Sequence, residues 1–218
     1  GQVLVDKAWG SIDVSCRKSG HQPTEVRVDS EVQGWTFGNI LKYVKMGSSS
    51  NFGNMVSMTG ASIFLPFLPM LPIQILLNNF LYDVSQAAIP ADSVDDEYLQ
   101  RARPWNTRYI ERFMVIMGPV SSVFDFLTFA VLLFVFRASA PLFHTGWFLE
   151  SLCTQTLVIH VIRTGKIPFI ESKPSPVLLF SSVYIVTIGL FLPFTGLGRQ
   201  FGFVAPPAGY FAALILII

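Results

Sequence analysis

The sequence is poor in charged residues. Asp, Glu, Lys and Arg make up 13% of the 218 residues, 51% are hydrophobic, and the mean hydropathy is +0.52. A typical soluble domain has about 25% charged residues. The low charge and the long apolar runs predict an integral membrane protein. The net charge is only +1, and Lys and Arg are scattered over the loops without forming a basic patch, so nucleic acid is not an expected partner.

Cysteines are also scarce. The two cysteines, Cys16 and Cys153, are 137 positions apart, which favours neither a disulfide nor a metal site. The first 30 residues are polar and do not resemble a signal peptide. The sequence starts without Met and stops inside the apolar run YFAALILII, so we expect a fragment of a larger protein.

Long apolar segments are the main feature of the chain. Because a crossing helix needs about 20 apolar residues, they predict an all-α fold: a polytopic transmembrane helical bundle with about five complete spans and a truncated sixth. A short polar segment, residues 1–33, precedes residues 34–218, and the alternation over 24–32 is compatible with a strand there. The expected spans are 51–68, 70–88, 113–136, 146–162 and 176–194, with the sixth starting at 207.

The first two spans form a predicted hairpin. Pro66, Pro69 and Pro72 lie between them, and each proline removes a backbone donor and clashes one turn back. Helical spacing over 35–46 predicts a helix that runs into the first span and projects beyond the membrane as a stalk.

Lys and Arg are distributed unevenly about these spans. Thirteen of the fifteen fall on one side, and only Arg137 and Arg199 fall on the other. The positive-inside rule then places the N-terminal segment and the 89–112 loop in the cytoplasm, for a multi-pass protein of the plasma (inner) membrane.

Three carboxylates lie within the expected spans: Asp83, Asp125 and Glu150. No Lys or Arg lies at the centre of a span to pair with them. An unpaired carboxylate at membrane depth is expensive, so it must be protonated, solvated or matched by a cation that comes and goes. The last case describes a transport site.

Amide and hydroxyl groups add further oxygen ligands. Asn51 and Asn54 are three apart and share one helix face, whereas Asn79 and Asp83 are four apart and share another. The hairpin is expected to bring these two faces together. Hard cations such as Mg²⁺ prefer oxygen ligands, and the lack of thiolates disfavours soft metals. The predicted metal ligands are Asn51, Asn54, Asn79, Tyr82, Asp83 and Glu150, with Asp125 and Gln155 as a polar network.

Structural roles compete with this interpretation. Asn and Ser side chains often join membrane helices by hydrogen bonds worth about 0.6 kcal/mol, and for Asn78 this role is favoured. A structural hydrogen bond rivals ligation by Asp125. Glu150, near the outer end of its expected span, could serve at the interface or where cations first enter. Trp105 and Trp147 look like interface anchors.

Four stretches carry a family resemblance: TFGNILKYVKMGSSSNFGNM, FLPFLPMLPIQILLNNFLYDVSQ, RPWNTRYIERFMVIMGPVSSVFDFLTF and GWFLESLCTQTLVIHVIRTGKIPFIES. Together they resemble the C-terminal membrane half of a P-type ATPase, most of all the bacterial magnesium-importing class. The resemblance covers residues 34–218 and implies that the spans are helices five to ten of the family. It implies that the ligands of helices five and six are Asn51, Asn54, Asn79, Tyr82 and Asp83, and that Glu150 occupies the polar place in helix eight.

The resemblance also implies parts that this sequence lacks. The phosphorylated-aspartate motif DKTGT, the nucleotide-binding region and helices one to four are absent, and residues 1–33 do not resemble the family. We therefore expect Mg²⁺ as the transported ion, ATP as a substrate of the full-length protein only, and the bilayer and the missing N-terminal half as partners. The fragment alone is not expected to pump.

Other functions stay open. A calcium or proton pump of the same family would use a similar bundle. A catalytically inactive fragment that binds a full-length pump or lipid would need no transport at all. A secondary transporter would be expected to show internal repeats, and the first and last spans show no self-similarity.

Overall fold

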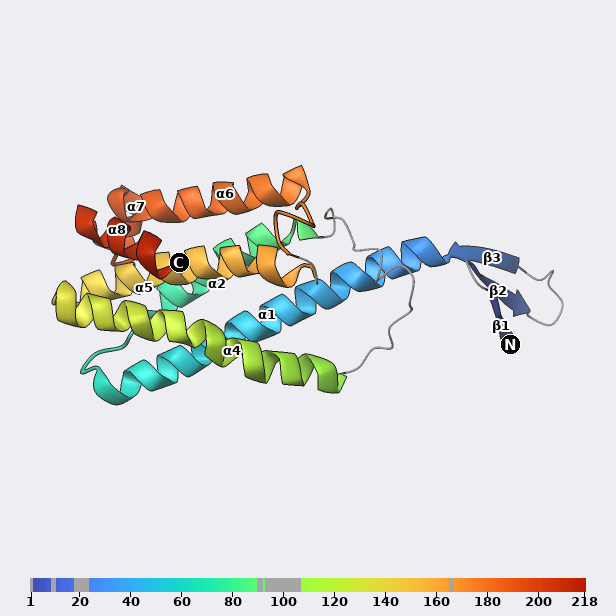
Figure 1. The fold of residues 1–218 in the computed structure, drawn as a ribbon, viewed down its shortest axis with the longest axis horizontal. Helices are drawn as coiled ribbons and strands as arrows, with labels where there is room; N and C mark the ends of the chain where they lie inside the picture. The colour runs from blue at the N-terminus through green and yellow to red at the C-terminus, as the bar shows by residue number, and fades with distance from the viewer. Residues whose placement is uncertain (1, 9–10, 18–23, 90–91, 93–106, 165–166) are drawn as a thin grey trace.

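A computed structural model describes residues 2–8, 11–17, 24–89, 92, 107–164 and 167–218 (Figure 1). The polar N-terminal segment forms a three-stranded antiparallel sheet of β1 (Gln2–Ala8), β2 (Ser11–Arg17) and β3 (Thr24–Asp29), paired in that order. The strand expected over 24–32 is thus present up to Asp29. The predicted all-α fold did not include this sheet. From Ser30 onward the named elements are helical, as predicted.

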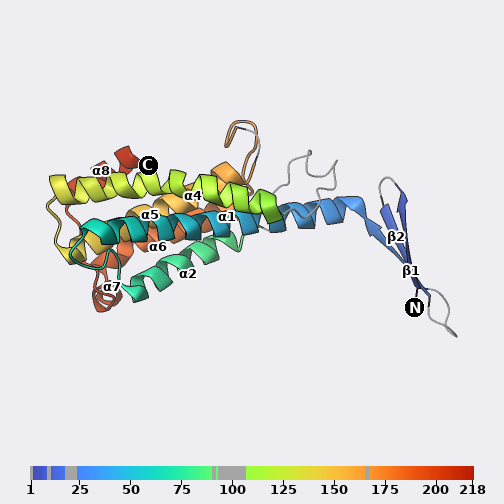
Figure 2. The same cartoon turned by 90° about the horizontal axis from the view of Figure 1, so that it is seen from below.

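Helix α1 (Ser30–Phe64) is a single helix of 35 residues. It leaves the bundle and reaches the sheet, which confirms the predicted helix that runs into the first span (Figures 1 and 2). That this helix projects beyond the membrane stays a prediction. The proposed domain boundary between residues 33 and 34 falls inside this helix and stays a prediction. The proline hairpin is confirmed, because α1 ends before Pro66 and α2 (Pro72–Gln86) begins with Pro72 in its first turn.

The other helices run back and forth along the bundle. They are α4 (Thr107–Ala130), extended by the π-helical turn η2 (Val131–Val135), then α5 (Ala140–Ile162) and α6 (Pro176–Phe191), extended by the 3₁₀ turn η3 (Leu192–Phe194). The short helices α7 (Gly196–Gln200) and α8 (Ala208–Ile217) complete the chain. The loop predicted over 89–112, with Trp105, lies largely outside the described residues.

The neighbours of α1 differ from those expected of a hairpin. Helix α1 packs mainly along α4, whereas α2 packs against α5 and α6 (Figure 2). The close approach of α1 to α4 depends on small residues: a methyl group on Gly53 would lie 2.6 Å from Ser121 Oγ and 3.0 Å from Gly118 O. The prediction that α1 and α2 lie side by side is therefore wrong over most of their length.

Among the described residues, two helices are long and apolar enough to cross a membrane, Ile110–Val135 and Pro176–Phe194. They coincide with the third and fifth expected spans, and α8 is a shorter apolar helix. The five-span count stays a prediction. Helix α2 has only 15 residues, and α5 buries a row of polar side chains that lowers its hydropathy.

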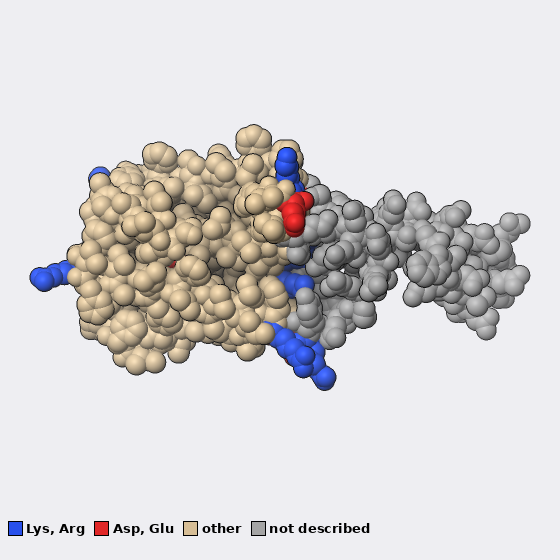
Figure 3. Space-filling view, in the orientation of Figure 1, with Lys and Arg blue, Asp and Glu red and all other residues tan. Residues whose placement is uncertain are grey.

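The surface of the bundle is largely uncharged. In Figure 3, Lys and Arg side chains of the described residues gather near its two ends, with a mainly neutral band between. Large apolar side chains such as Ile63, Phe134, Phe180 and Leu216 are exposed by 75% or more on this bundle. Such a surface suits lipid rather than water.

Candidate functional site

A cavity of about 60 Å³ lies between α1, α4 and α5. Five apolar side chains form part of its wall: Met117, Val120, Phe124, Val158 and Ile162. The polar part consists of Ser49, Ser50, Asn54, Ser121, Asp125, Ser151, Thr154 and Gln155. This volume holds a few water molecules or a partly hydrated ion. We call it the Asp125 pocket.

Amide and hydroxyl groups from three helices meet on one side of the Asp125 pocket. Gln155 Nε2 donates to Asn54 Oδ1 at 2.9 Å and to Ser151 Oγ at 2.7 Å. Asn78, on α2, donates from Nδ2 to Ser151 Oγ at 3.1 Å. These bonds leave the buried oxygens Gln155 Oε1 and Asn78 Oδ1 without a donor among the described residues. Buried polar atoms are nearly always satisfied, so water or a cation belongs beside them.

Asp125 accepts hydrogen bonds on both oxygens. Ser57 Oγ donates to Oδ2 at 2.5 Å, and Trp147 Nε1 donates to Oδ1 at 2.8 Å. Both donors are neutral and both side chains are buried. Among the described residues, the groups that donate to Asp125 are therefore dipoles.

Glu150 lies against Asp125, and their carboxyl groups interact directly. Glu150 is fully buried, Thr154 Oγ1 donates to its Oε1 at 2.5 Å, and its Oε2 has no donor among the described residues. Two ionised carboxylates in contact repel each other strongly. A proton or a bound cation must therefore accompany the pair.

The structure brings some predicted ligands together and separates others. Asn54, Asp125 and Gln155 line the pocket, and Tyr82 reaches its edge through a 2.8 Å hydrogen bond with Ser50. Asn51 and Asp83 are exposed, and Asn79 is half-buried, with no donor to its Oδ1 in the part of the chain that the structure describes. The predicted convergence of the Asn51/Asn54 face with the Asn79/Asp83 face is wrong here, because Asn54 faces α5 and Asp83 faces outward.

Two positions differ from expectation because α5 starts at Ala140, six residues before the expected span. Glu150 thus lies at the middle of the helix and not near its outer end. Trp147, predicted as an interface anchor, is only 2% exposed and packs edge-on against Phe129, with ring centroids 4.9 Å apart. The sequence contained no signal for the Trp147–Asp125 bond, since it joins two helices that only the fold brings together.

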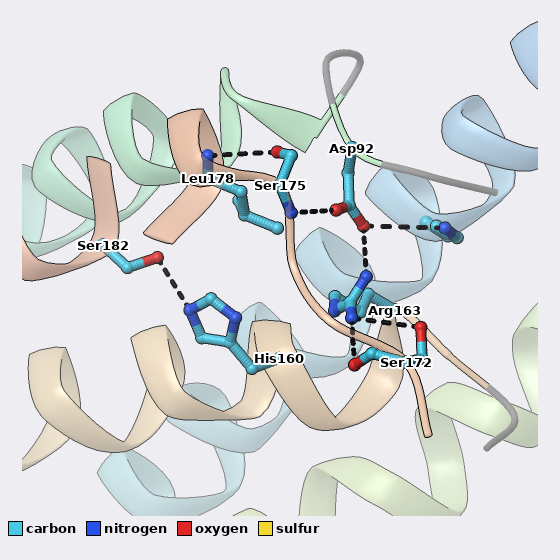
Figure 4. Close-up of polar contacts among 8 residues, drawn as sticks. Asp92, His160, Arg163, Ser172, Ser175, Leu178 and Ser182 are labelled. Atoms are coloured by element: carbon cyan, nitrogen blue, oxygen red, sulfur yellow. Dashed lines mark hydrogen bonds and ion pairs between the residues drawn. The ribbon is translucent and has the colours of Figure 1, made fainter. Parts of the chain in front are cut away.

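A second buried polar region surrounds Asp92 (Figure 4). Arg163 Nη1 lies 2.8 Å and Lys42 Nζ 3.8 Å from Asp92 Oδ2, and Ser175 N donates to Oδ1 at 2.9 Å. Arg163 also donates to Ser172 O at 2.6 Å. We call these residues the Asp92 cluster; it ties α1 to the C-terminal end of α5 and the N-terminal end of α6.

His160 lies close to this cluster (Figure 4). Its Nε2 pairs with Ser182 Oγ at 3.0 Å. In the described part of the chain, no three His, Cys, Asp or Glu side chains gather into a metal-binding group. A cation in the Asp125 pocket would depend on amide, hydroxyl and backbone oxygens beside the carboxylates.

Comparison with known proteins gives consistent matches. Residues 67–218 match the family described as cation transporting ATPase, C-terminus. The chain is 49% identical over 187 residues to the "Magnesium-transporting ATPase, P-type 1" of Escherichia coli (strain K12), covering 84% of the chain and 21% of that relative. A protein of the same name from Salmonella typhimurium (strain LT2) is 47% identical over 184 residues, or 83% of the chain and 20% of the relative.

The chain thus spans about a fifth of the length of the curated relatives it matches. The family match covers most of the described bundle, including α2, α4, α5 and α6. Together with the apolar helices Ile110–Val135 and Pro176–Phe194, it supports a membrane location. The chain belongs to the cation-transporting ATPases, of which it carries the C-terminal region.

Proposed function

We propose that this chain is the ion-translocating membrane part of an ATP-driven Mg²⁺ importer, and that the Asp125 pocket is part of its cation path. Asp125, Asn54 and Gln155 would face the ion, with Glu150 behind Asp125. ATP would be used in a part of the protein outside this chain. The chain alone would not pump.

One observation carries this proposal. The Asp125 pocket gathers a carboxylate and several amide and hydroxyl oxygens, and the donors to Asp125 are neutral. Hard divalent cations prefer such oxygen ligands. Gln155, which lines the pocket, has its Oε1 buried without a donor among the described residues, so an arriving cation would supply what this oxygen lacks.

The choice of Mg²⁺ rests on the names of the relatives and on the chemistry of the pocket. Both relatives named above are magnesium-transporting ATPases. Mg²⁺ dehydrates reluctantly and tends to keep several waters, with one or two carboxylates as ligands. A pocket lined by one carboxylate, Asp125, and by the amides of Asn54 and Gln155 suits an ion that keeps part of its water shell.

The arrangement of charged residues supports the proposed orientation. Arg108 and Arg112 lie at the start of α4, Arg163 follows α5, and Lys173 precedes α6. These ends lie together where α1 leaves the bundle, whereas Arg137 and Arg199 belong to the opposite end (Figure 1). By the positive-inside rule, the end from which α1 leaves would face the cytoplasm of the plasma (inner) membrane.

Asn51, Asn79 and Asp83 belong to a second part of the proposed path. An ionised carboxylate facing hydrocarbon is costly, about 2.5–3.5 kcal/mol on insertion scales, and Asp83 is exposed on α2. We propose that a membrane segment outside this chain covers this face in the complete ATPase. Asp83 would then ligate the cation, or its water shell, together with that segment.

Replacing the C-terminal fifth of the E. coli relative with residues 34–218 tests the proposal. The chimera is expressed in E. coli cells that lack their own Mg²⁺ uptake systems, and growth at low Mg²⁺ and cellular Mg²⁺ content are measured. We expect the chimera to restore growth and uptake at low Mg²⁺, and Asp125→Asn to lose both at that low concentration. Uptake that survives Asp125→Asn would contradict the pocket assignment, and uptake of Ca²⁺ without Mg²⁺ would favour a calcium pump.

The same experiment addresses an inactive interaction fragment. Such a fragment would associate with a full-length pump or with lipid but would not restore uptake in a chimera. A chimera that is made in normal amounts, reaches the membrane and restores no Mg²⁺ uptake would therefore favour that function over transport.

A further inference from the structure

Asp125 is held at both ends of its carboxylate by donors from two different helices. Ser57 on α1 binds Oδ2 and Trp147 on α5 binds Oδ1, at 2.5 and 2.8 Å. The exposed fraction of Ser57 is 0% and that of Trp147 is 2%, so neither donor can move away without disturbing the core. The orientation of the Asp125 carboxylate is therefore fixed by the fold and not by a ligand.

The Trp147 ring is itself fixed by aromatic packing. It lies edge-on to Phe129, with ring planes at 87°, and Phe129 packs against Phe143 at a centroid distance of 5.1 Å. Because the indole is wedged in this way, its N–H points at Asp125 Oδ1 along one direction. The Ser57 hydroxyl restrains the other oxygen from the opposite helix.

A carboxylate restrained in this way has limited ways to bind a cation. Each oxygen already accepts one hydrogen bond, so the carboxylate cannot rotate to follow a larger ion without breaking the Trp147 bond or the Ser57 bond. Ca²⁺ takes six to eight oxygens and often binds a carboxylate through both of them, whereas Mg²⁺ requires an octahedral set with shorter contacts. A carboxylate that cannot rotate suits the ion with the strict octahedral geometry better than the ion with the larger and more variable ligand set.

We infer that Trp147 and Ser57 are positioning residues that set the preference of the Asp125 pocket for Mg²⁺ over Ca²⁺. They touch no cation themselves and act by holding the Asp125 carboxylate in one fixed orientation. This inference rests on the proposed function, because it requires that the transported ion meet Asp125.

The hydrogen bond from Trp147 to Asp125 could also have a purely structural role, and in that case its loss would not change ion selectivity. A buried indole N–H needs an acceptor, and Asp125 could serve only that need. Trp147→Phe separates the two, because it keeps a ring against Phe129 and removes the N–H. Ser57→Ala removes the other donor with little change in volume.

Tyr210→Phe is the matched control. The Tyr210 hydroxyl donates to Gly146 O on α5 at 2.7 Å and is buried, and it is absent from the lining of the Asp125 pocket. This variant also removes one buried donor to α5 while keeping its aromatic ring. Any general loosening of α5 should therefore appear in Tyr210→Phe as well.

The experiment uses the full-length chimera described above and measures Mg²⁺ uptake at rising Ca²⁺ concentrations. The selectivity ratio is the Ca²⁺ concentration that halves Mg²⁺ uptake divided by the Mg²⁺ concentration that gives half-maximal uptake. We expect Trp147→Phe and Ser57→Ala each to lower this ratio about tenfold, or about 1.4 kcal/mol. Tyr210→Phe should leave the ratio at the parental value.

An unchanged ratio in both Trp147→Phe and Ser57→Ala overturns the inference, as does an equal change in Tyr210→Phe. If Trp147→Phe does not accumulate in the membrane, Ser57→Ala decides the question alone. A parental chimera that takes up no Mg²⁺ contradicts the proposed function instead, so the two failures are distinguishable.

Discussion

Two buried aspartates of this bundle have opposite surroundings. Asp92 contacts Arg163 and Lys42 and accepts a backbone N–H from Ser175. Asp125 accepts hydrogen bonds from Ser57 and Trp147, which are neutral, and touches a second carboxyl group, Glu150. Among the described residues, the first carboxylate has cationic partners, whereas the second borders a cavity and its hydrogen-bond donors are neutral.

The difference shows how burial and function are related in this protein. A buried charge is stable only when it is paired or hydrogen-bonded. At Asp92 the fold supplies the pairing, so an incoming cation would have to displace Arg163. At Asp125 the described donors are neutral, so the cation of the proposed function would add to the site without breaking an ion pair. The charge of the partners, more than the depth of burial, separates a structural carboxylate from a ligand.

Removing the structural carboxylate is expected to have the largest effect. Asp92→Ala leaves Arg163 and Lys42 buried without their shared counter-charge, and breaking a buried ion pair in this way costs about 3–5 kcal/mol. We expect a large fall in the Tm of the detergent-purified chimera. Glu171→Gln is the control, because Glu171 is exposed in the nearby loop. Equal Tm values for the two variants would mean that the Asp92 cluster contributes little to the stability of the folded bundle.

Neutralising the proposed ligand comes next. Asp125→Asn keeps the size of the side chain and an oxygen acceptor for Trp147 but removes the negative charge that attracts the cation. We expect the Mg²⁺ concentration for half-maximal uptake to rise about a hundredfold, or about 2.7 kcal/mol, while the Tm stays close to the parental value. The opposite result, a fall in Tm with normal uptake, would make Asp125 resemble Asp92.

A control on the same helix separates charge from packing. Ser122 lies one turn before Asp125 on α4 and donates to Gly53 O at 3.0 Å across the contact between α1 and α4. Ser122→Ala removes this bond without changing the charge in the pocket. Uptake that falls as far in Ser122→Ala as in Asp125→Asn would point to helix packing as the cause.

Sequence patterns predicted where the helices lie in the chain better than they predicted which helices pack together. The continuous apolar runs predicted the helices Ile110–Val135 and Pro176–Phe194, and three prolines predicted the hairpin after α1. Both signals are local, since they depend on the transfer of one segment into lipid or on backbone geometry. The packing of α1 along α4 was not predictable in this way, because it depends on the fit of Gly53 and Gly118 across 65 positions.

The candidate site was predicted in part for the same reason. Helical spacing marked Asn54, and an apolar span marked Asp125 and Glu150 as unusual. Spacing shows which residues share a face but not which helix that face meets, so the convergence expected with Asp83 was wrong. Asp92 was missed as a structural residue because its partner Arg163 is 71 positions away and lies near the end of another span.

The exposed carboxylate Asp83 offers a third case, between Asp92 and Asp125. Asp83→Asn removes a charge that is not part of the Asp125 pocket, so we expect a smaller change. An increase of about tenfold in the Mg²⁺ concentration for half-maximal uptake, or about 1.4 kcal/mol, would agree with ligation shared with another segment. A hundredfold increase, with little effect of Asp125→Asn, would move the main site to α2.

The smallest effect is expected at Asn78, which donates to Ser151 Oγ at 3.1 Å between α2 and α5. Interhelical hydrogen bonds of this kind average about 0.6 kcal/mol in membranes, so Asn78→Ala should lower the Tm of the chimera slightly and leave Mg²⁺ uptake near the parental value. Asn78 Oδ1 is nevertheless buried without a donor among the described residues. If that oxygen contacts the cation, Asn78→Ala will raise the half-saturating Mg²⁺ concentration more than it changes the Tm. The cation path would then extend from the Asp125 pocket to α2, and Ser151 would link the two.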